Sequence, residues 1–330
     1  MTDSSGETTD LFDSPRVQEA ERAHERDNAL RPRSLAELFW LTRDPPPLRA
    51  LLRDSTDANR GDIFLPRGRV GMLVAPGGTG KTMALLQLGV SVAAGLPWLG
   101  RFVVDPDAIG RVIVILGEED DDSAHRRIAT IAKHLRISED PVVLDLLQRN
   151  FHFLSMHGRS TQLIDATGNT TDTFKQLQDQ IGNLSHGGPL SMLAIDPAAR
   201  FMGPNSELES SAATRFVQLF EPLTKLPGRP SVLMCHHATK NAAKSKTTDQ
   251  GAARGSSALT DGVRWQANLT RCSDTEGTDR DYDLELTLVK ANDVKPLKRP
   301  VRLKRLSGGY LRATAVSTRR TPAEDFDSRF

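Results

Sequence analysis

The sequence has few cysteines, few aromatic residues, no excess of either charge and no long apolar run. Its two cysteines, Cys235 and Cys272, are too few for a disulfide framework or a four-ligand zinc site, and they fit a reducing compartment. With 43 lysines and arginines against 42 acidic residues, the net charge of +1 does not predict a polyanionic partner. The most apolar stretch, residues 83–99, is interrupted by polar residues, glycine and proline, which argues against a membrane span.

The ends of the sequence are polar, whereas its middle carries the apolar patterns of a folded domain. The opening segment MTDSSGETTDLFD has four acidic residues, no basic residue and no apolar run, so it is not expected to be a signal peptide. These features predict a soluble, cytoplasmic protein. We expect a flexible arm over residues 1–33, a short helical extension over 34–60 around three prolines, a main domain over 61–315 and a flexible tail over 316–330.

Strand and helix patterns alternate along the main domain. The expected strands cover residues 70–75, 111–116, 151–154, 190–195, 231–235, 263–270, 284–290 and 301–306. Between the earlier strands, apolar residues recur at helical spacing, as at Phe174, Leu177 and Ile181. The later strands follow one another without long helices. The sequence therefore predicts an α/β fold with a mostly parallel central sheet, helices on both faces and antiparallel C-terminal strands.

A glycine-rich motif stands between an apolar strand pattern and an apolar helix pattern. It consists of Ala75, Pro76, Gly77, Gly78, Thr79, Gly80, Lys81 and Thr82. The spacing is that of a P-loop, in which backbone N–H groups and the start of the following helix surround phosphates. Lys81 is then expected to reach the β- and γ-phosphates of ATP, and the Thr82 hydroxyl to bind Mg²⁺. ATP and Mg²⁺ are thus the predicted ligands.

Carboxylates follow two further apolar strands. Asp196 ends LSMLAID, where a Walker-B acid would help to hold Mg²⁺. Glu118 and Glu119 follow RVIVILG, and ATP hydrolysis needs a carboxylate there to orient and polarise the attacking water. The residues alone leave either glutamate as the candidate base. Arg127, nine residues after Glu118, is a surface arginine on a helix by the simplest interpretation.

Two histidines, His236 and His237, follow the strand pattern SVLMC. A polar side chain at such a strand end can contact the γ-phosphate and transmit its loss to a neighbouring loop. Two histidines that merely cap a strand fit the pattern as well, so both interpretations stay open. Cys235 stands beside them, but no second ligand pair at metal spacing accompanies it, and zinc is not expected.

Two basic segments occur in the C-terminal half. The first is rich in small polar residues, and its positive residues are Lys240, Lys244, Lys246 and Arg254. A loop of this kind suits contacts with the backbone of single-stranded DNA, although a solvated linker has a similar composition. The second holds six basic residues between Lys295 and Arg305, which predicts either a basic edge strand or a track for phosphates.

Together these segments resemble the hexameric plasmid replicative helicase RepA family, which belongs to the RecA/DnaB-like ATPases. The resemblance lies, in this order, in GMLVAPGGTGKTMALLQL, VIVILGEED, LAIDPAARFMG, VLMCHHATK, AARGSSALTDGVRWQ and LVKAN. It covers residues 60–295, and the His-His-Ala and Arg-Gly-Ser-Ser blocks are more specific than the P-loop.

The resemblance implies a RecA-like ATPase core and a set of roles for particular residues. By this resemblance Lys81 and Thr82 bind nucleotide and Mg²⁺, Asp196 is the Walker-B acid and Glu118 is the catalytic base. The resemblance also makes Arg127 a phosphate sensor, and His236 and His237 a switch between nucleotide and DNA. Arg264 corresponds to an arginine finger, and Lys290 to a lysine that acts on a neighbouring subunit. The family assembles as six-membered rings with ATP at the subunit interfaces.

Two functions from different classes follow. The first is an ATP-dependent helicase or translocase, a homo-oligomer that is expected to be hexameric and moves on single-stranded DNA in replication. Its N-terminal arm is then a candidate contact for a replication-initiation or other accessory protein. The second is an oligomeric ATPase of the same fold that acts as a regulatory or defence-system switch without unwinding DNA.

Overall fold

The structure, a computed structural model, describes residues 44–56, 61–203, 209–238, 257–272 and 283–314. The chain divides into two compact units, Met1–Pro47 and Leu48–Phe330. The described part of the first unit, residues 44–47, contains neither helix nor strand, and everything below concerns the second unit. The predicted arm (1–33) and tail (316–330) lie outside the described residues, and the predicted domain limits stay predictions.

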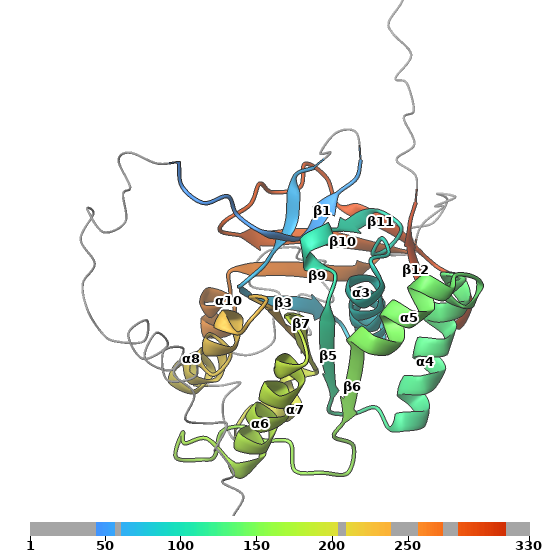
Figure 1. The fold of residues 1–330 in the computed structure, drawn as a ribbon. Coiled ribbons are helices and arrows are strands. Elements are labelled where there is room, and N and C mark those ends of the chain that lie inside the picture. Colours follow the sequence, from blue (N-terminus) through green and yellow to red (C-terminus); the bar gives the residue numbers. More distant parts are fainter. Residues whose placement is uncertain (1–43, 57–60, 204–208, 239–256, 273–282, 315–330) are drawn as a thin grey trace, which may run out of the picture. The chain divides into compact units, whose positions relative to one another are not determined.

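Within the described residues, one large sheet of nine strands organises the second unit (Figure 1). Its spatial order is β12-β11-β10-β9-β3-β8-β7-β5-β6. The strands are β3 (Val70–Ala75), β5 (Arg111–Leu116), β6 (Phe151–Ser155), β7 (Leu190–Asp196), β8 (Ser231–His237), β9 (Trp265–Arg271), β10 (Leu284–Ala291), β11 (Val301–Arg305) and β12 (Leu311–Ala313). The six from β9 to β6 are parallel, and β10, β11 and β12 are antiparallel.

Helices cover both faces of this sheet. The helices are α3 (Lys81–Ala94), α4 (Asp121–His134), α5 (Pro141–Asn150), α6 (Asp172–His186), α7 (Ala198–Phe201), α8 (Ser210–Gln218) and α10 (Ser257–Gly262), with short turns η2 (Pro106–Ala108), η3 (Ile137–Glu139), η4 (Pro222–Lys225) and η6 (Ser307–Gly309). In Figure 1, α3, α4 and α5 lie on one side, and α6, α7, α8 and α10 on the other. The predicted α/β fold is confirmed.

Alternation along the central strands creates two apolar cores. On β3, Leu73 packs with α3 in one core, whereas Met72 and Val74 belong to the other core with α6 and α8. Strands with both faces buried are expected at the centre of a parallel sheet, which explains their continuous apolar sequences. Helix α3 is buried almost all round, because the sheet covers one side and other elements pack against the rest.

A second, smaller sheet with the order β2-β1-β4 contains residues that the sequence did not assign to strands. Its strands are β1 (Ala50–Asp54), β2 (Ile63–Pro66) and β4 (Phe102–Val104). The prediction of short helices over the extension 34–60 is wrong for residues 50–54, where β1 forms instead. Leu51 and Leu52 are both fully buried, and β1 pairs on both sides, so tertiary pairing overrides the local helical pattern.

The two sheets meet through aromatic side chains. Phe64 of β2 stacks on Phe102 of β4 at 3.9 Å between ring centroids, and Trp265 of β9 meets Phe64 edge-on at 5.5 Å. The Trp265 indole N–H donates to the Phe64 carbonyl at 2.8 Å, so this buried polar group is satisfied. None of the described helices is long and apolar enough to cross a membrane.

Candidate nucleotide-binding and catalytic site

The predicted P-loop, residues 75–82, joins the end of β3 to the start of α3. Gly78 and Gly80 have φ angles of +68° and +105°, which side chains rarely adopt, so glycine is required to form the loop. The Thr79 N–H donates to the Pro76 carbonyl at 3.2 Å, and this bond closes a turn. The loop thus brings its backbone to the N-terminal end of a 14-residue helix, where anions are stabilised.

Lys81 and Asp196 meet at the base of this loop. Lys81 begins α3, Asp196 ends β7 before a cis-proline, and their side chains form a buried ion pair. Burial alone would lower the pKa of Lys81, but the negative charges of Asp196 and Glu118 raise it above its ordinary value. Thr82, the other predicted Mg²⁺ ligand, is half-buried in the first turn of α3 beside Lys81.

These groups fit a nucleotide with its metal ion. Lys81 supplies a positive charge, Thr82 and Asp196 supply the oxygen ligands that Mg²⁺ prefers, and the loop supplies backbone N–H groups. The Thr79 hydroxyl is buried and has no hydrogen-bond partner among the described residues. A Cβ atom at Gly77 would meet nothing within 4 Å, so space is open above the loop.

The adjacent residues Glu118 and Glu119 have different partners. Glu118 accepts a hydrogen bond from Arg200 of α7 at 3.1 Å, and both side chains are about half exposed. Glu119 accepts one from Arg127 of α4 at 2.8 Å. Glu118 also contributes to the raised pKa of Lys81, whereas Glu119 does not. Glu118 therefore lies close enough to Lys81 to interact with it electrostatically, and Glu119 is bound to α4.

Arg127, the predicted phosphate sensor, is thus paired with Glu119. The predicted switch residues His236 and His237 end β8, which is hydrogen-bonded to β3 with His237 opposite Ala75. His236 is fully buried on the face of the sheet that carries α8, and His237 is half-buried at the level where the P-loop begins. The histidines are therefore neighbours of the phosphate loop.

Arg264 and Lys290 lie at the opposite edge of the sheet. Trp265 pairs with Gly71, and the Arg264 N–H donates to the Val70 carbonyl at 2.9 Å, so Arg264 stands where β3 begins. β3 spans six residues, which corresponds to about 20 Å between this edge and the P-loop. Lys290 is at the same edge and donates to the carbonyls of Thr260 and Asp261 at 2.7 and 3.0 Å. Neither side chain reaches the P-loop of its own chain.

The side chains of Arg264 and Lys290 differ in their exposure and in their hydrogen bonds. Arg264 is exposed, and its guanidinium makes no hydrogen bond or ion pair with any described residue. The pKa of Lys290 is lowered by burial and by the nearby charge of Arg264, with Asp261 opposing. The four predicted DNA-binding residues, Lys240, Lys244, Lys246 and Arg254, lie outside the described residues.

Sequence reasoning did not assign a contact at the P-loop edge of the sheet to three arginines. Arg200 contacts Glu118, Arg271 donates to the Gly78 carbonyl at 2.5 Å, and Arg305 donates to the Thr79 carbonyl. Arg305 belongs to the second basic cluster, between Lys295 and Arg305, for which the sequence predicts either a phosphate track or a basic edge strand. The alternative of an edge strand is wrong, because β11 pairs with β10 on one side and β12 on the other.

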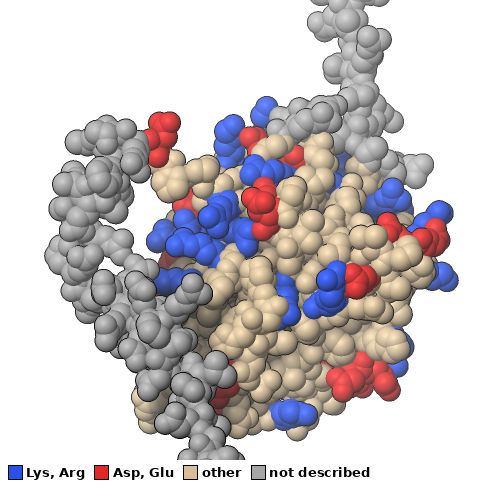
Figure 2. Space-filling view, in the orientation of Figure 1, with Lys and Arg blue, Asp and Glu red and all other residues tan. Residues whose placement is uncertain are grey.

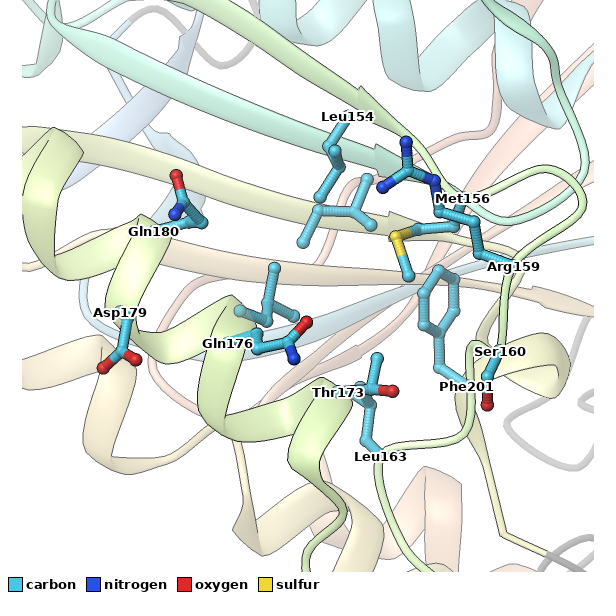
Figure 3. A pocket seen from close by; sticks show the side chains of 12 residues that line it. Leu154, Met156, Arg159, Ser160, Leu163, Thr173, Gln176, Asp179, Gln180 and Phe201 are labelled. Carbon is cyan, nitrogen blue, oxygen red and sulfur yellow. The ribbon is translucent and has the colours of Figure 1, made fainter.

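A separate cavity of about 630 Å³ opens between β6 and α6 (Figure 3). Leu154, Leu163 and Phe201 line its interior, while Gln176 and Gln180 reach it from α6. It contains no residue of the P-loop, and Arg159 is its single basic side chain. This cavity is therefore not the phosphate site.

A P-loop at the carboxyl end of parallel strands, with a buried Lys–Asp pair and a neighbouring glutamate, defines the chain as a P-loop ATPase. Residues 27–243 match the model of a protein family described as AAA domain. This match covers more than half of the sequence, and the chain belongs to that family.

Proposed function

We propose that the chain is an ATP-driven helicase or translocase related to the RepA-type hexameric helicases, which moves on single-stranded DNA. The observation that carries the ATPase part is the buried Lys81–Asp196 pair under the P-loop, with Glu118 near it. The oligomeric part is supported by the position of Arg264, which is exposed and about 20 Å from its own P-loop.

In this proposal, the P-loop N–H groups and Lys81 bind the β- and γ-phosphates, and Thr82 and Asp196 hold Mg²⁺. The metal ion supplies positive charge that offsets the charge developing on the phosphates. Glu118 orients a water molecule and accepts its proton as the water oxygen bonds to the γ-phosphorus and the bond to the bridging oxygen breaks. Arg200 must release Glu118 or turn with it for this step, because the two are paired at 3.1 Å.

An arginine from a neighbouring subunit completes the site. Arg264 carries a permanently charged, forked group that can make bidentate contacts with a γ-phosphate. Figure 2 shows Lys and Arg side chains gathered near the start of β9, at the edge where Arg264 and Lys290 lie. Lys290 is the weaker candidate, since its amine is already bound to two carbonyls of α10.

Contact with DNA is assigned to the segment that holds Lys240, Lys244, Lys246 and Arg254. It follows His236 and His237, and β8 lies directly beside β3, which leads into the P-loop. A change at the γ-phosphate can therefore reach the segment through one strand end. This adjacency supports a coupling between ATP hydrolysis and movement on single-stranded DNA.

Two assays test the proposal. Lys81→Ala is expected to abolish ATP hydrolysis, because it removes the positive charge that binds the phosphates. The substitution also leaves the buried Asp196 without its partner, so an unchanged circular dichroism spectrum is needed to show that the variant is folded. Lys133→Ala, an exposed change on α4, is the matched control and should hydrolyse ATP normally.

The second assay measures ATP-dependent displacement of a DNA strand. Displacement by the wild-type protein supports the helicase. ATP hydrolysis without displacement supports the regulatory or defence-system switch instead.

A further inference from the structure

Two arginines from the C-terminal strands donate hydrogen bonds to backbone carbonyls of the P-loop. Arg271 at the end of β9 donates to the Gly78 carbonyl at 2.5 Å, and Arg305 at the end of β11 donates to the Thr79 carbonyl. A Cβ atom at Gly78 would lie 3.1 Å from the Arg271 guanidinium, and one at Gly80 would lie 3.4 Å from that of Arg305. Both guanidinium groups therefore lie directly against the glycines of the loop.

A peptide unit is planar, and in the trans form its C=O and N–H groups point in opposite directions. When Arg305 holds the Thr79 carbonyl, the N–H of Gly80 must therefore point away from Arg305. The Gly78–Thr79 peptide is fixed at both ends, since Arg271 binds its carbonyl and its N–H donates to Pro76. Each arginine thus determines the orientation of one peptide in the loop.

The strand that carries Arg305 is itself fixed to the helix that follows the loop. Gln87, buried in α3, donates to the Leu311 carbonyl at 2.8 Å and accepts from the Leu311 N–H at 3.0 Å. Leu311 of β12 pairs directly with Arg305 of β11. Hydrogen bonds thereby join the loop, helix α3 and the β11–β12 hairpin to one another.

We propose that Arg305 is a positioning residue that keeps the Gly80 N–H of the P-loop directed at the phosphates of a nucleoside di- or triphosphate, and that Arg271 assists by fixing the preceding peptide, whose N–H is bound to Pro76. The inference rests on the proposed binding of ATP at this loop. It assigns the C-terminal strands a part in nucleotide affinity, although they lie some 190 to 230 residues from the loop in sequence. Their permanent positive charges also attract polyphosphates to the site.

The test measures equilibrium binding of a methylanthraniloyl-labelled ATP to the full chain. Arg305→Met removes the donor and the charge but keeps an unbranched stem, and it should weaken binding about tenfold, as expected for the loss of one charge-assisted hydrogen bond. Arg305→Lys keeps a charged donor and should recover most of the affinity. Arg271→Met should have a smaller effect, because Pro76 still holds the same peptide.

Arg312→Met is the matched control. Arg312 is one residue from Leu311 on β12, so it points to the other face of the same hairpin. This variant should bind the labelled ATP like the wild type. For Arg305→Met, the KM for ATP should rise while kcat at saturating ATP stays within about twofold, because the loop acts in binding.

Two results would overturn the inference. One is equal affinity of Arg305→Met and Arg312→Met, and the other is a fall in kcat without a rise in KM, which indicates a loss of folded protein. A wild-type chain that binds no labelled ATP would contradict the proposed function itself, and this outcome is distinct from equal affinities among the variants.

Discussion

Glu118 and Glu119 are adjacent in sequence but are bound by arginines from different helices. Because Glu118 lies near Lys81, Glu118→Gln should still bind ATP and should hydrolyse it at least about a hundredfold more slowly, since the amide keeps the shape but accepts no proton. Single-turnover hydrolysis and equilibrium binding measure the two effects separately. Glu119→Gln is the control, and it should retain turnover because its carboxylate faces Arg127. The reverse result would move the catalytic base to Glu119.

Two buried groups beneath the P-loop predict a loss of stability in alkali. Full burial and the nearby Asp196 raise the pKa of the Cys235 thiol well above its ordinary value, with Lys81 opposing, and the pKa of Lys81 is raised as well. In the folded chain both groups keep protons that the unfolded chain releases. Their contribution to stability is therefore complete below about pH 8.5 and declines as the pH rises above it.

The urea midpoint measured between about pH 7 and 11 checks this prediction. Cys235→Ala removes the first contribution, so its decline should begin nearer the ordinary pKa of lysine, about 10.4. An identical pH profile for the wild type and the variant would contradict the prediction.

Residues of the site differ in how far the sequence reveals them. The P-loop, Asp196 and the pair Glu118 and Glu119 are signalled by contiguous patterns, because each follows an apolar strand and parallel strands present their carboxyl ends together. Arg200, Arg271 and Arg305 carry no such signal. Their contacts depend on side chains that meet only after the sheet has formed. The sequence therefore shows Arg305 as a member of a basic cluster but does not indicate which group it contacts.

At the scale of elements, Gln87 fixes strand β12 to helix α3. Gln87→Leu has a similar volume but leaves the N–H and C=O of Leu311 buried without their partner. We expect the free energy of unfolding to fall by about 2–4 kcal/mol, the cost of two unsatisfied backbone groups. Urea unfolding measures this change. Gln148→Leu, an exposed substitution on α5, is the control and should change it by less than about 0.5 kcal/mol. Equal values for the two variants would contradict the role of Gln87.

The elements that sequence predicts are those with a self-contained pattern. All eight expected strands are present, because each is either continuously apolar or alternates apolar and polar residues, and both patterns can be recognised without the neighbouring strands. Strands β1, β2, β4 and β12 were missed. They are three to five residues long, and their pairing partners lie in other parts of the chain, as when Leu52 of β1 pairs with Val104 of β4. Short strands of this kind are determined by tertiary contacts.

At the scale of the whole molecule, two inactive variants should restore each other's activity. Lys81→Ala lacks a working P-loop, and Arg264→Ala lacks the proposed finger. In a mixed oligomer, some interfaces combine the P-loop of an Arg264→Ala subunit with the intact Arg264 of a Lys81→Ala subunit. An equal mixture should therefore recover about a quarter of the wild-type ATP turnover if subunits exchange at random.

Steady-state ATPase assays of the mixture measure this recovery, with native mass measurements to show that mixed oligomers form. Arg229→Ala, which also changes a described arginine, is the control partner and should be active alone. Mixed oligomers without any recovery would show that Arg264 acts within its own chain or only in folding, and Lys290 would become the better finger candidate.

The register of β9 against β3 also determines how copies of the chain can complete the proposed site. With Trp265 opposite Gly71, the phosphate loop and Arg264 occupy opposite ends of the same parallel strands. In a twofold pair, residue i of one copy contacts residue j of the other and the reverse, so two copies with antiparallel strands complete both of their sites. In a head-to-tail arrangement, every copy gives an arginine to one neighbour and receives one from another. Head-to-tail contacts close into a ring or continue as a helical filament, so the number of copies in the assembly distinguishes the two arrangements.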